Sequence, residues 1–487
     1  MSGQDLHAVI FSGGGADGAY QIGVANALFS GKSKATYGEP MEPEVFTGTS
    51  IGSFNASFLV SHWGDYGAAA VGKLEKVWLE RMAWQGATNG GFRVRLSPFE
   101  LFDPRAYMKE PLRFRPLTQL ASDVGLLGWE ALSRTYNLAA SKEPLLERLT
   151  DFFNLSSFVA VEPWERTIRE TIDYKKIRNS DKKLRIAATN WAFGEVREFR
   201  NQDMTDKLGP AAIRASSSVP GIYPPAQVGA QSYVDGAVLM NTPLSPAIQA
   251  MREVVADPMK DPKFYDLPVR EAMQVADLER GQYDPDTDLV LHVIYMNTDV
   301  EKMPIAALQS TLQTLYRTQI ISWANAVNQD IERAGLLNQG LDYVRNVGNL
   351  DLLAKKEALE DKKRSAKLET DEATELKSLE RELAGTEPEL KSLREKLKKL
   401  SDNQLRSILQ AAESLVDRLT AGHPYKQLTI HRYFPPDGLD GALGFLDVRR
   451  SRFERLIAEG FTDTVYHDCR ANRCILAGRH KVLAPED

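Results

Sequence analysis

Residues 6–29 read LHAVIFSGGGADGAYQIGVANALF, and this stretch determines the fold that we expect. The apolar run at 6–11 predicts a buried β-strand. The glycines at 13–15 predict a tight turn, and the apolar residues spaced through 20–29 predict a helix. The chain therefore begins as a strand, a glycine turn and a helix.

A second unit repeats this order around Ser50. Residues 44–49 form a short β-like run, and Phe54, Phe58 and Leu59 mark the apolar face of a following helix. Further strand candidates are Leu184–Ala188, Ser232–Val234, Leu289–Met296 and Leu428–Tyr433. Near-continuous apolar strands are typical of a sheet covered on both faces, so we predict an α/β fold with three layers, α/β/α, and a mainly parallel sheet.

Composition sets the broad class of the protein. With 487 residues, 43% hydrophobic and 26% charged, the chain is long enough for a large core and has the balance of a globular protein. A net charge of -6 gives no electrostatic reason to expect a nucleic-acid partner. No secretory signal or membrane span is apparent, so we expect a cytoplasmic protein, with peripheral membrane contact left open.

The two cysteines, Cys469 and Cys474, lie close together near the C-terminus. A disulfide between them would close only a short loop, and their spacing lacks the other ligands of a zinc site. The sequence therefore predicts two free thiols and no metal centre.

Gly48-Thr49-Ser50-Ile51-Gly52 fits the pattern Gly-x-Ser-x-Gly. In this pattern a serine on a sharp strand-to-helix turn presents its hydroxyl above the sheet, and the glycines remove side chains that would collide in the turn. The helix that follows directs its free N–H groups at charge that develops beside the serine. Ser50 is therefore a candidate nucleophile.

The glycine-rich loop at 13–18 permits two interpretations. Backbone amides that no side chain covers can converge on an oxyanion. The same letters satisfy Gly-x-Gly-x-x-Gly, the dinucleotide fingerprint, with Glu39 and Glu42 at about the right distance for a ribose. The strand–Ser50–helix unit favours the oxyanion hole, because a nucleotide-binding domain has no need of such a unit.

A serine nucleophile needs a base. None of the seven histidines has a motif around it: His7, His62, His292, His423, His431, His467 and His480. Asp235 does, in YVDGA at the end of a predicted strand, with Asn241-Thr242-Pro243 in a following turn. A carboxylate with the ordinary pKa of about 3.9 is a weak base, so this role requires a dry site. The alternative is that Asp235 only caps a turn.

Together, in this order, these pieces resemble the patatin-like phospholipase family. The matching stretches are SGGGADGAYQIGVANAL from Ser12, GTSIGSFNAS around Ser50, RASSSVPGIYPP from Arg214, YVDGAVLMNTP from Tyr233 and GFLDVRRSRFERLIAEGF from Gly444. The likeness covers most of the chain outside about 85–180 and 350–420.

The resemblance implies a Ser–Asp dyad that works without histidine, metal or cofactor. Ser50 would be the nucleophile and Asp235 its base. The oxyanion-hole amides would come from Gly13, Gly14 and Gly15. The family commonly carries Lys or Arg where this chain has Asp17, so the likeness does not extend to a preference for anionic phospholipids.

Residues 351–400 contain 26 charged residues, and leucines recur among them at helical spacing. This pattern predicts a long antiparallel helical hairpin at about 350–420, which serves either chain assembly or simple decoration. We expect a patatin-like catalytic domain at 1–349 with a cap inserted at about 85–180. Residues 421–487 would complete that domain with a strand and a helix.

These patterns predict a lipid acyl hydrolase of the phospholipase A or lysophospholipase type that acts on a phospholipid or another lipid ester. A short-chain carboxylesterase is the nearest alternative. A dinucleotide-binding oxidoreductase that uses Gly13, Gly15 and Gly18 is a second, and a lipid-binding scaffold with an inactive site is a third. The predicted hairpin would support a homo-oligomer.

Overall fold

The computed structural model describes residues 5–84, 90–91, 93–94, 159–220, 222–255, 288–296, 311–365, 370–383, 388, 390–392, 395, 427–436 and 447–484. The chain divides into two compact units. The larger unit comprises Asp5–Met251, Leu289–Ile331 and Thr429–Asp487, and the smaller comprises Met1–Gln4, Arg252–Asp288 and Glu332–Leu428.

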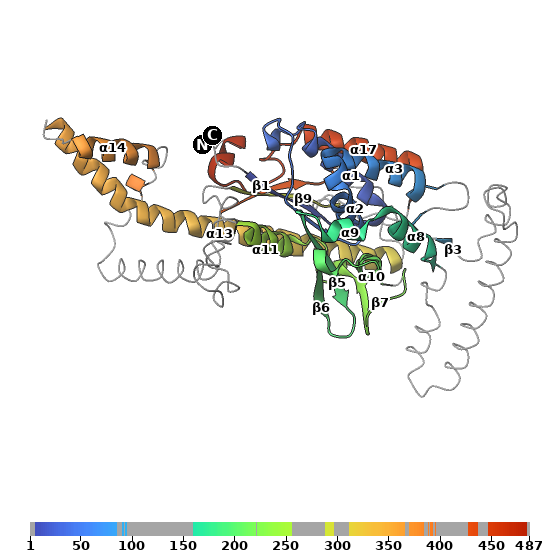
Figure 1. Cartoon of the computed structure of the whole chain (residues 1–487). Helices are drawn as coiled ribbons and strands as arrows, with labels where there is room; N and C mark the ends of the chain where they lie inside the picture. The colour runs from blue at the N-terminus through green and yellow to red at the C-terminus, as the bar shows by residue number, and fades with distance from the viewer. Residues whose placement is uncertain are drawn as a thin grey trace, which may run out of the picture. The chain divides into compact units, whose positions relative to one another are not determined.

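An eight-stranded sheet forms the centre of the larger unit (Figure 1). Its strands are β1 (Asp5–Phe11), β2 (Val45–Thr49), β5 (Lys183–Asn190), β6 (Glu195–Arg200), β7 (Ala226–Val228), β8 (Gln231–Asp235), β9 (Asp288–Ile294) and β10 (Leu428–Tyr433). The order is β10-β9-β1-β2-β5-β8-β7, and β6 pairs with β5. All six strands that the sequence predicted are present, and helices flank the sheet, so the predicted α/β class is confirmed.

The sheet changes direction at β5. Strands β1, β2 and β5 pair in parallel, whereas β6 and β8 are antiparallel to β5, and β7 is antiparallel to β8. The prediction of a mainly parallel sheet was therefore wrong for this side. The sequence did not predict two strands of this sheet, β6 and β7. The first half of β6 is exposed and reads EVR, and β7 has only three residues.

The register along β5 brings the ends of two strands together. β2 pairs with β5 as far as Thr49, opposite Ala187, and β8 pairs with β5 from Asp235, opposite Ala188. β6 occupies the other edge of β5 over all of these positions. β2 and β8 therefore meet end to end on one edge of β5, and the residues at their carboxyl ends become neighbours.

The helices of the larger unit pack on the sheet and on one another (Figure 1). Their bounds are α1 (Gly18–Phe29), α2 (Ile51–Tyr66), α3 (Ala70–Val77), α8 (Glu162–Thr171), α9 (Tyr174–Arg178), α10 (Leu208–Ser216), α11 (Leu244–Val255) and α17 (Arg450–Val465). Helix α17 lies along α1, where Tyr20 donates a hydrogen bond to Asp463 at 2.9 Å. Near the other end of α17, Phe453 packs edge-on against Trp78. The C-terminal helix thus packs into the core of the larger unit.

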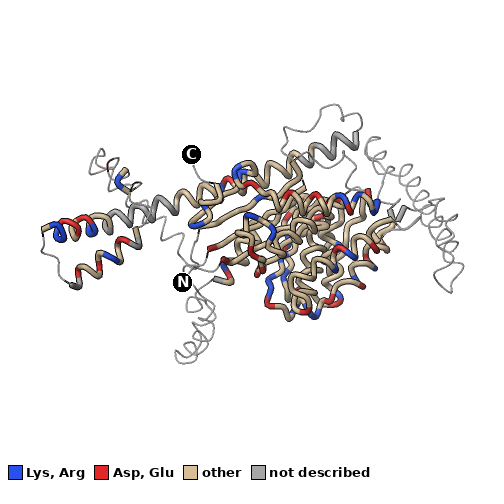
Figure 2. The backbone as a smooth tube through the Cα atoms, turned by 90° about the horizontal axis from the view of Figure 1, so that it is seen from above, with Lys and Arg blue, Asp and Glu red and all other residues tan. Residues whose placement is uncertain are grey.

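Helix α13 (Thr311–Arg364) belongs to the smaller unit from Glu332 onward, where it forms a helical hairpin with α14 (Thr370–Glu382). Leu359 of α13 is buried against Leu376 and Leu379 of α14, so the helices run antiparallel. Acidic and basic residues both occur along the described parts of the two helices (Figure 2). The predicted hairpin is present, but α13 starts at Thr311, well before the predicted boundary at 350, and residues 396–426 lie outside the described part.

Most of the predicted cap also lies outside the described residues, which resume at Val159. Its flanks form a two-stranded sheet, in which β3 (Arg93–Val94) pairs with β4 (Val159–Ala160), followed by α8 and α9. Across the described ranges, every helix is too short or too polar to cross a membrane.

Candidate active site

Ser50 occupies the sharp turn between β2 and α2. Its backbone has φ 55°, a left-handed conformation that is uncommon for a residue with a side chain. A Cβ atom built on Gly48 would lie 2.2 Å from the Gly52 carbonyl oxygen, and one built on Gly52 would lie 2.2 Å from that of Phe11. Both glycines of the Gly-x-Ser-x-Gly pattern are therefore required by close backbone packing, as predicted.

The hydroxyl of Ser50 donates a hydrogen bond to Asp235. Ser50 Oγ lies 2.6 Å from Asp235 Oδ2, although the two residues are separated by 185 positions. The second carboxylate oxygen, Oδ1, accepts a hydrogen bond from the Ala237 N–H at 2.8 Å. Asp235 thus caps a turn and contacts Ser50 at the same time, so the two roles that the sequence offered for it are compatible.

The environment of Asp235 changes its acidity. The residue is only 1% exposed, and this burial raises the pKa of its carboxyl to about 7, while hydrogen bonds from Ser50 and Ala237 act in the opposite direction. A carboxylate whose pKa is near neutrality holds a proton far more strongly than an exposed aspartate does. The dry site that a carboxylate base requires is therefore present.

A serine-rich segment at the end of α10 supports both partners. The Ser50 N–H donates to Ser216 Oγ at 2.9 Å, and Ser216 Oγ in turn donates to the Ala187 carbonyl oxygen at 2.6 Å. The Asp235 N–H donates to the Ser218 carbonyl oxygen at 2.9 Å. This segment belongs to the RASSS stretch, whose serine contacts could not be predicted from the sequence alone.

The glycine-rich loop lies beside Ser50, with one departure from the prediction. A Cβ atom built on Gly13 would lie 3.0 Å from the Cβ of Ser50. However, the Gly13 N–H donates to the carbonyl oxygen of Asn241 at 3.1 Å, so it is not free to bind an oxyanion. Within the described ranges, the N–H groups of Gly14 and Gly15 have no such acceptor. The candidate oxyanion donors therefore shift to these two residues.

A largely apolar pocket opens at Ser50. It is lined by Gly15, Ala16, Ser50, Ile51, Trp78, Met82, Gly91, Trp164, Ser217, Val219, Ile222, Tyr223, Val448 and Phe453. Trp164 is fixed in the wall by a hydrogen bond from its indole N–H to Ser217 Oγ at 2.8 Å. The sequence missed most of these residues because they come from segments that only folding brings together.

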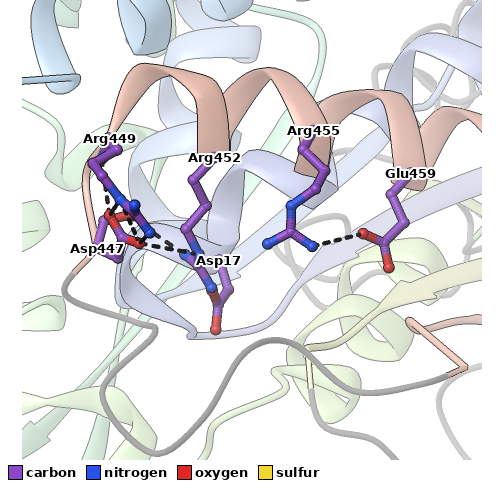
Figure 3. A network of polar contacts seen from close by, with 6 residues as sticks. All are labelled: Asp17, Asp447, Arg449, Arg452, Arg455 and Glu459. Atoms are coloured by element: carbon purple, nitrogen blue, oxygen red, sulfur yellow. Dashed lines mark hydrogen bonds and ion pairs between the residues drawn. The ribbon is translucent and has the colours of Figure 1, made fainter.

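Asp17, the departure from the family pattern, forms a buried ion pair with helix α17. Arg452 Nη2 lies 2.6 Å from Asp17 Oδ1, and the two side chains are 2% and 11% exposed. Asp447 lies on the other side of the guanidinium, 3.8 Å from Nε (Figure 3). A positive group does stand beside the glycine loop, but it comes from the C-terminal helix and two carboxylates surround it.

The described histidines lie away from this pocket. His7 is at the start of β1, whereas the glycine loop follows its end. His292 stacks on His431 at 5.3 Å between ring centroids, and His62 contacts the Phe58 carbonyl oxygen within α2. No described histidine lines the pocket. Ser50 contacts Asp235 directly, at 2.6 Å between Oγ and Oδ2. His423 lies outside the described residues.

Comparison with known proteins gives a family match for the region that contains this site. The model of the family described as patatin-like phospholipase matches residues 9–248, which include the glycine loop, Ser50, Ser216 and Asp235. No curated protein sequence matches significantly. Among solved structures, the chain is similar to the crystal structure of VipD from Legionella pneumophila. The identity is 12%, the match covers 94% of this chain and 67% of that one, and the TM-score is 0.26.

Proposed function

We propose that this chain, which belongs to the patatin-like phospholipase family through residues 9–248, hydrolyses lipid esters with Ser50 as nucleophile and Asp235 as general base. The family gives the general activity, lipid acyl hydrolysis. The observation that supports the finer assignment is the 2.6 Å hydrogen bond from Ser50 Oγ to a buried carboxylate at the mouth of an apolar pocket.

In this mechanism, Asp235 accepts the proton of the Ser50 hydroxyl as Oγ attacks the acyl carbon. The carbonyl oxygen becomes an oxyanion, for which the N–H groups of Gly14 and Gly15 and those of the first turn of α2 are the candidate donors. Asp235 then gives the proton to the leaving alcohol as the ester bond breaks. Water, deprotonated by the same carboxylate, releases the fatty acid from Ser50 and restores the hydroxyl.

The surroundings of the dyad favour a lipid over a small polar ester. Trp78, Trp164 and Phe453 present an apolar wall to an acyl chain. Arg452 is already neutralised by Asp17, which supports zwitterionic or neutral lipids rather than selection for anionic headgroups. The favoured activity is therefore that of a phospholipase A or a lysophospholipase, and a short-chain esterase is the second choice. Either lipase activity would involve peripheral contact with a membrane during turnover.

The dinucleotide alternative has less support. Its loop needs amides that can approach a pyrophosphate, and the Gly13 amide is bonded to Asn241. Titration of NADH or NADPH fluorescence separates the two functions, since the hydrolase assignment expects no binding.

The direct test is fatty-acid release from phosphatidylcholine vesicles, measured by mass spectrometry. We expect Ser50→Ala to lower release by more than about a thousandfold, because the nucleophile is gone. Ser57→Ala is the matched control. Ser57 is a buried serine on the same helix whose hydroxyl donates to the Ser53 carbonyl oxygen, and its loss should leave release close to wild type. Undiminished release by Ser50→Ala would contradict the assignment.

Phosphatidylcholine with two different acyl chains refines the substrate class in the same assay. Release of one chain together with lysophosphatidylcholine supports phospholipase A, and the chain identity gives the position. Activity on lysophosphatidylcholine alone supports a lysophospholipase. Hydrolysis of short-chain esters with neither lipid cleaved would instead support the carboxylesterase alternative.

A further inference from the structure

Four metal-ligating side chains that do not line the pocket converge on and beside the edge strand β10. We name them the C-terminal cluster: His431, His467, Cys469 and Cys474. One donor atom of each lies within 4.8 Å of the other three, and all four residues belong to the larger unit. His431, His467 and Cys469 are buried. Both cysteines are free, as predicted, but the sequence did not show that two histidines accompany them.

The sulfur–nitrogen separations agree with a shared tetrahedral centre. Cys469 Sγ lies 3.5 Å from Nδ1 of His431, and Cys474 Sγ lies 3.3 Å from Nε2 of His467. Bond lengths of about 2.3 Å for Zn–S and 2.0–2.1 Å for Zn–N, at a tetrahedral angle, give S···N edges of about 3.5 Å. These two edges therefore already have the length that a shared ion requires, and all the donor atoms lie within 4.8 Å of one another.

We propose that the C-terminal cluster binds one Zn²⁺ ion in a tetrahedral site of two sulfur and two nitrogen ligands. This donor set is typical of structural zinc, and all four positions are filled by the protein, which leaves none for a catalytic water. Two thiolates and Zn²⁺ also sum to zero charge, which suits a buried location.

The backbone holds the two cysteines in position for this role. The Cys474 N–H donates to the Cys469 carbonyl oxygen at 2.9 Å and closes a tight loop, in which Arg473 has the left-handed φ of 52°. Ile475 then pairs with Ile430 through both backbone hydrogen bonds, at 2.7 and 3.0 Å. This bridge fixes the loop against β10, where His431 follows Ile430.

The histidine rings are also oriented for binding. The Asn472 amide lies 2.9 Å from Nδ1 of His467, on the far side of the ring from Cys474, so Nε2 faces the sulfur atoms. Zinc binding through Nε2 would leave the ring proton on Nδ1, so the Asn472 amide would have to turn its oxygen toward Nδ1 to accept that proton. His431 is fully buried, and its Nε2 has no hydrogen-bond partner among the described residues, so its strongest polar contact is with the Cys469 sulfur. A zinc bond would give this ring a firm partner.

The site would have a structural role. His467 and the cysteine loop directly follow α17, whose first turns carry Arg452 and the pocket residue Phe453. Zinc would tie this end of the chain to β10 and so anchor α17. The proposal is independent of the proposed hydrolase function, because no ligand lines the pocket.

The test uses the full chain, produced with zinc and a thiol reductant. Elemental mass spectrometry should find about one zinc per chain. After zinc removal, Co²⁺ should give the visible bands of a tetrahedral ion and a thiolate-to-cobalt charge-transfer band. Cys474→Ser should lose both signals. His292→Gln is the matched control and should keep them, since His292 is equally buried and stacks on His431 but is no ligand.

A measurement on the unmodified protein covers the case in which Cys474→Ser does not fold. Verified removal of zinc should lower the melting temperature, and added Zn²⁺ should restore it. The proposal is overturned by absence of stoichiometric zinc, by an unchanged melting temperature or by full Co²⁺ signals in folded Cys474→Ser. A disulfide between Cys469 and Cys474 in the zinc-grown, reduced protein also overturns it. Ser50→Ala should bind zinc normally, which separates this test from that of the hydrolase.

Discussion

At the residue scale, one buried carboxyl links stability to the proposed chemistry. Burial raises the pKa of Asp235 to about 7, so between about pH 4 and pH 7 the folded chain holds a proton that the unfolded chain releases. Because the folded state binds more protons in this window, the contribution of Asp235 to stability falls as the pH rises through it. Above about pH 7 the Asp235 side chain is a buried negative charge, which the hydrogen bonds from Ser50 and Ala237 stabilise.

Replacement of Asp235 by asparagine separates the two effects. We expect Asp235→Asn to lower hydrolysis by about a hundred- to ten-thousandfold, because the base is lost. At pH 8 the same variant should melt at a higher temperature than wild type, since the buried charge is gone, and this advantage should shrink toward pH 4. Thermal unfolding at both pH values checks the sign. An equal decrease in melting temperature at pH 8 and pH 4 would indicate a packing defect instead.

The sequence predicted the central pair of the site but not its environment. GTSIG identified Ser50 because turn geometry restricts that position locally, whereas YVDG identified Asp235 through its resemblance to the patatin-like family. The engagement of Gly13 by Asn241 depends on a contact between distant segments, so the loop sequence could not reveal it. The raised pKa likewise depends on burial, which only the folded structure shows.

At the element scale, helix α17 is fixed to the glycine loop by the ion pair between Arg452 and Asp17 (Figure 3). Removal of Arg452 would leave the buried carboxylate of Asp17 without its countercharge. We therefore expect Arg452→Leu to lower the free energy of unfolding by about 3–5 kcal/mol. The matched control is Arg455→Leu on the same helix. Arg455 is 51% exposed and pairs loosely with Glu459 at 3.9 Å, so its loss should cost about 1 kcal/mol or less. Urea unfolding of both variants measures the difference.

The double variant Asp17→Asn with Arg452→Leu tests the cause. If the stranded carboxylate of Asp17 is responsible, the double variant should be more stable than Arg452→Leu alone. A double variant that is less stable by the full sum of the single effects would show that packing, rather than charge, dominates at this position.

The strands illustrate what a pattern can and cannot show. The apolar runs predicted β1, β2, β5, β8, β9 and β10 because burial on both faces dictates their composition. β6 was missed because its exposed half includes the charged residues Glu195 and Arg197, and β7 was missed because it is too short for a period to appear. The end-to-end meeting of β2 and β8 follows from register, which no single strand encodes.

At the scale of the whole molecule, the hairpin of α13 and α14 buries some of its leucine side chains within one chain. Leu359, Leu376 and Leu379 bury one another within one chain, and Lys362 forms an ion pair with Glu372 near the turn. The leucine spacing predicted long helices in this segment, but it did not identify Leu359 as the partner of Leu376 and Leu379. The start of α13 at Thr311 was not predicted, because the residues before 350 lack the charged pattern that marked the segment.

Assembly through the hairpin stays a prediction. If chains associate through this segment, deletion of residues 350–420 should convert an oligomer into a monomer, as measured by light scattering, while fatty-acid release per chain persists. The same number of chains per particle before and after the deletion would contradict assembly through the hairpin.

The most direct test of the central claim is covalent labelling by a fluorophosphonate, followed by mass spectrometry of the modified peptide. We expect an adduct on Ser50. The labelling rate should rise with pH through about 7, as Asp235 loses its proton, and should fall sharply in Asp235→Asn. An adduct on another serine, or a rate at Ser50 that neither pH nor Asp235→Asn changes, would contradict activation of Ser50 by Asp235.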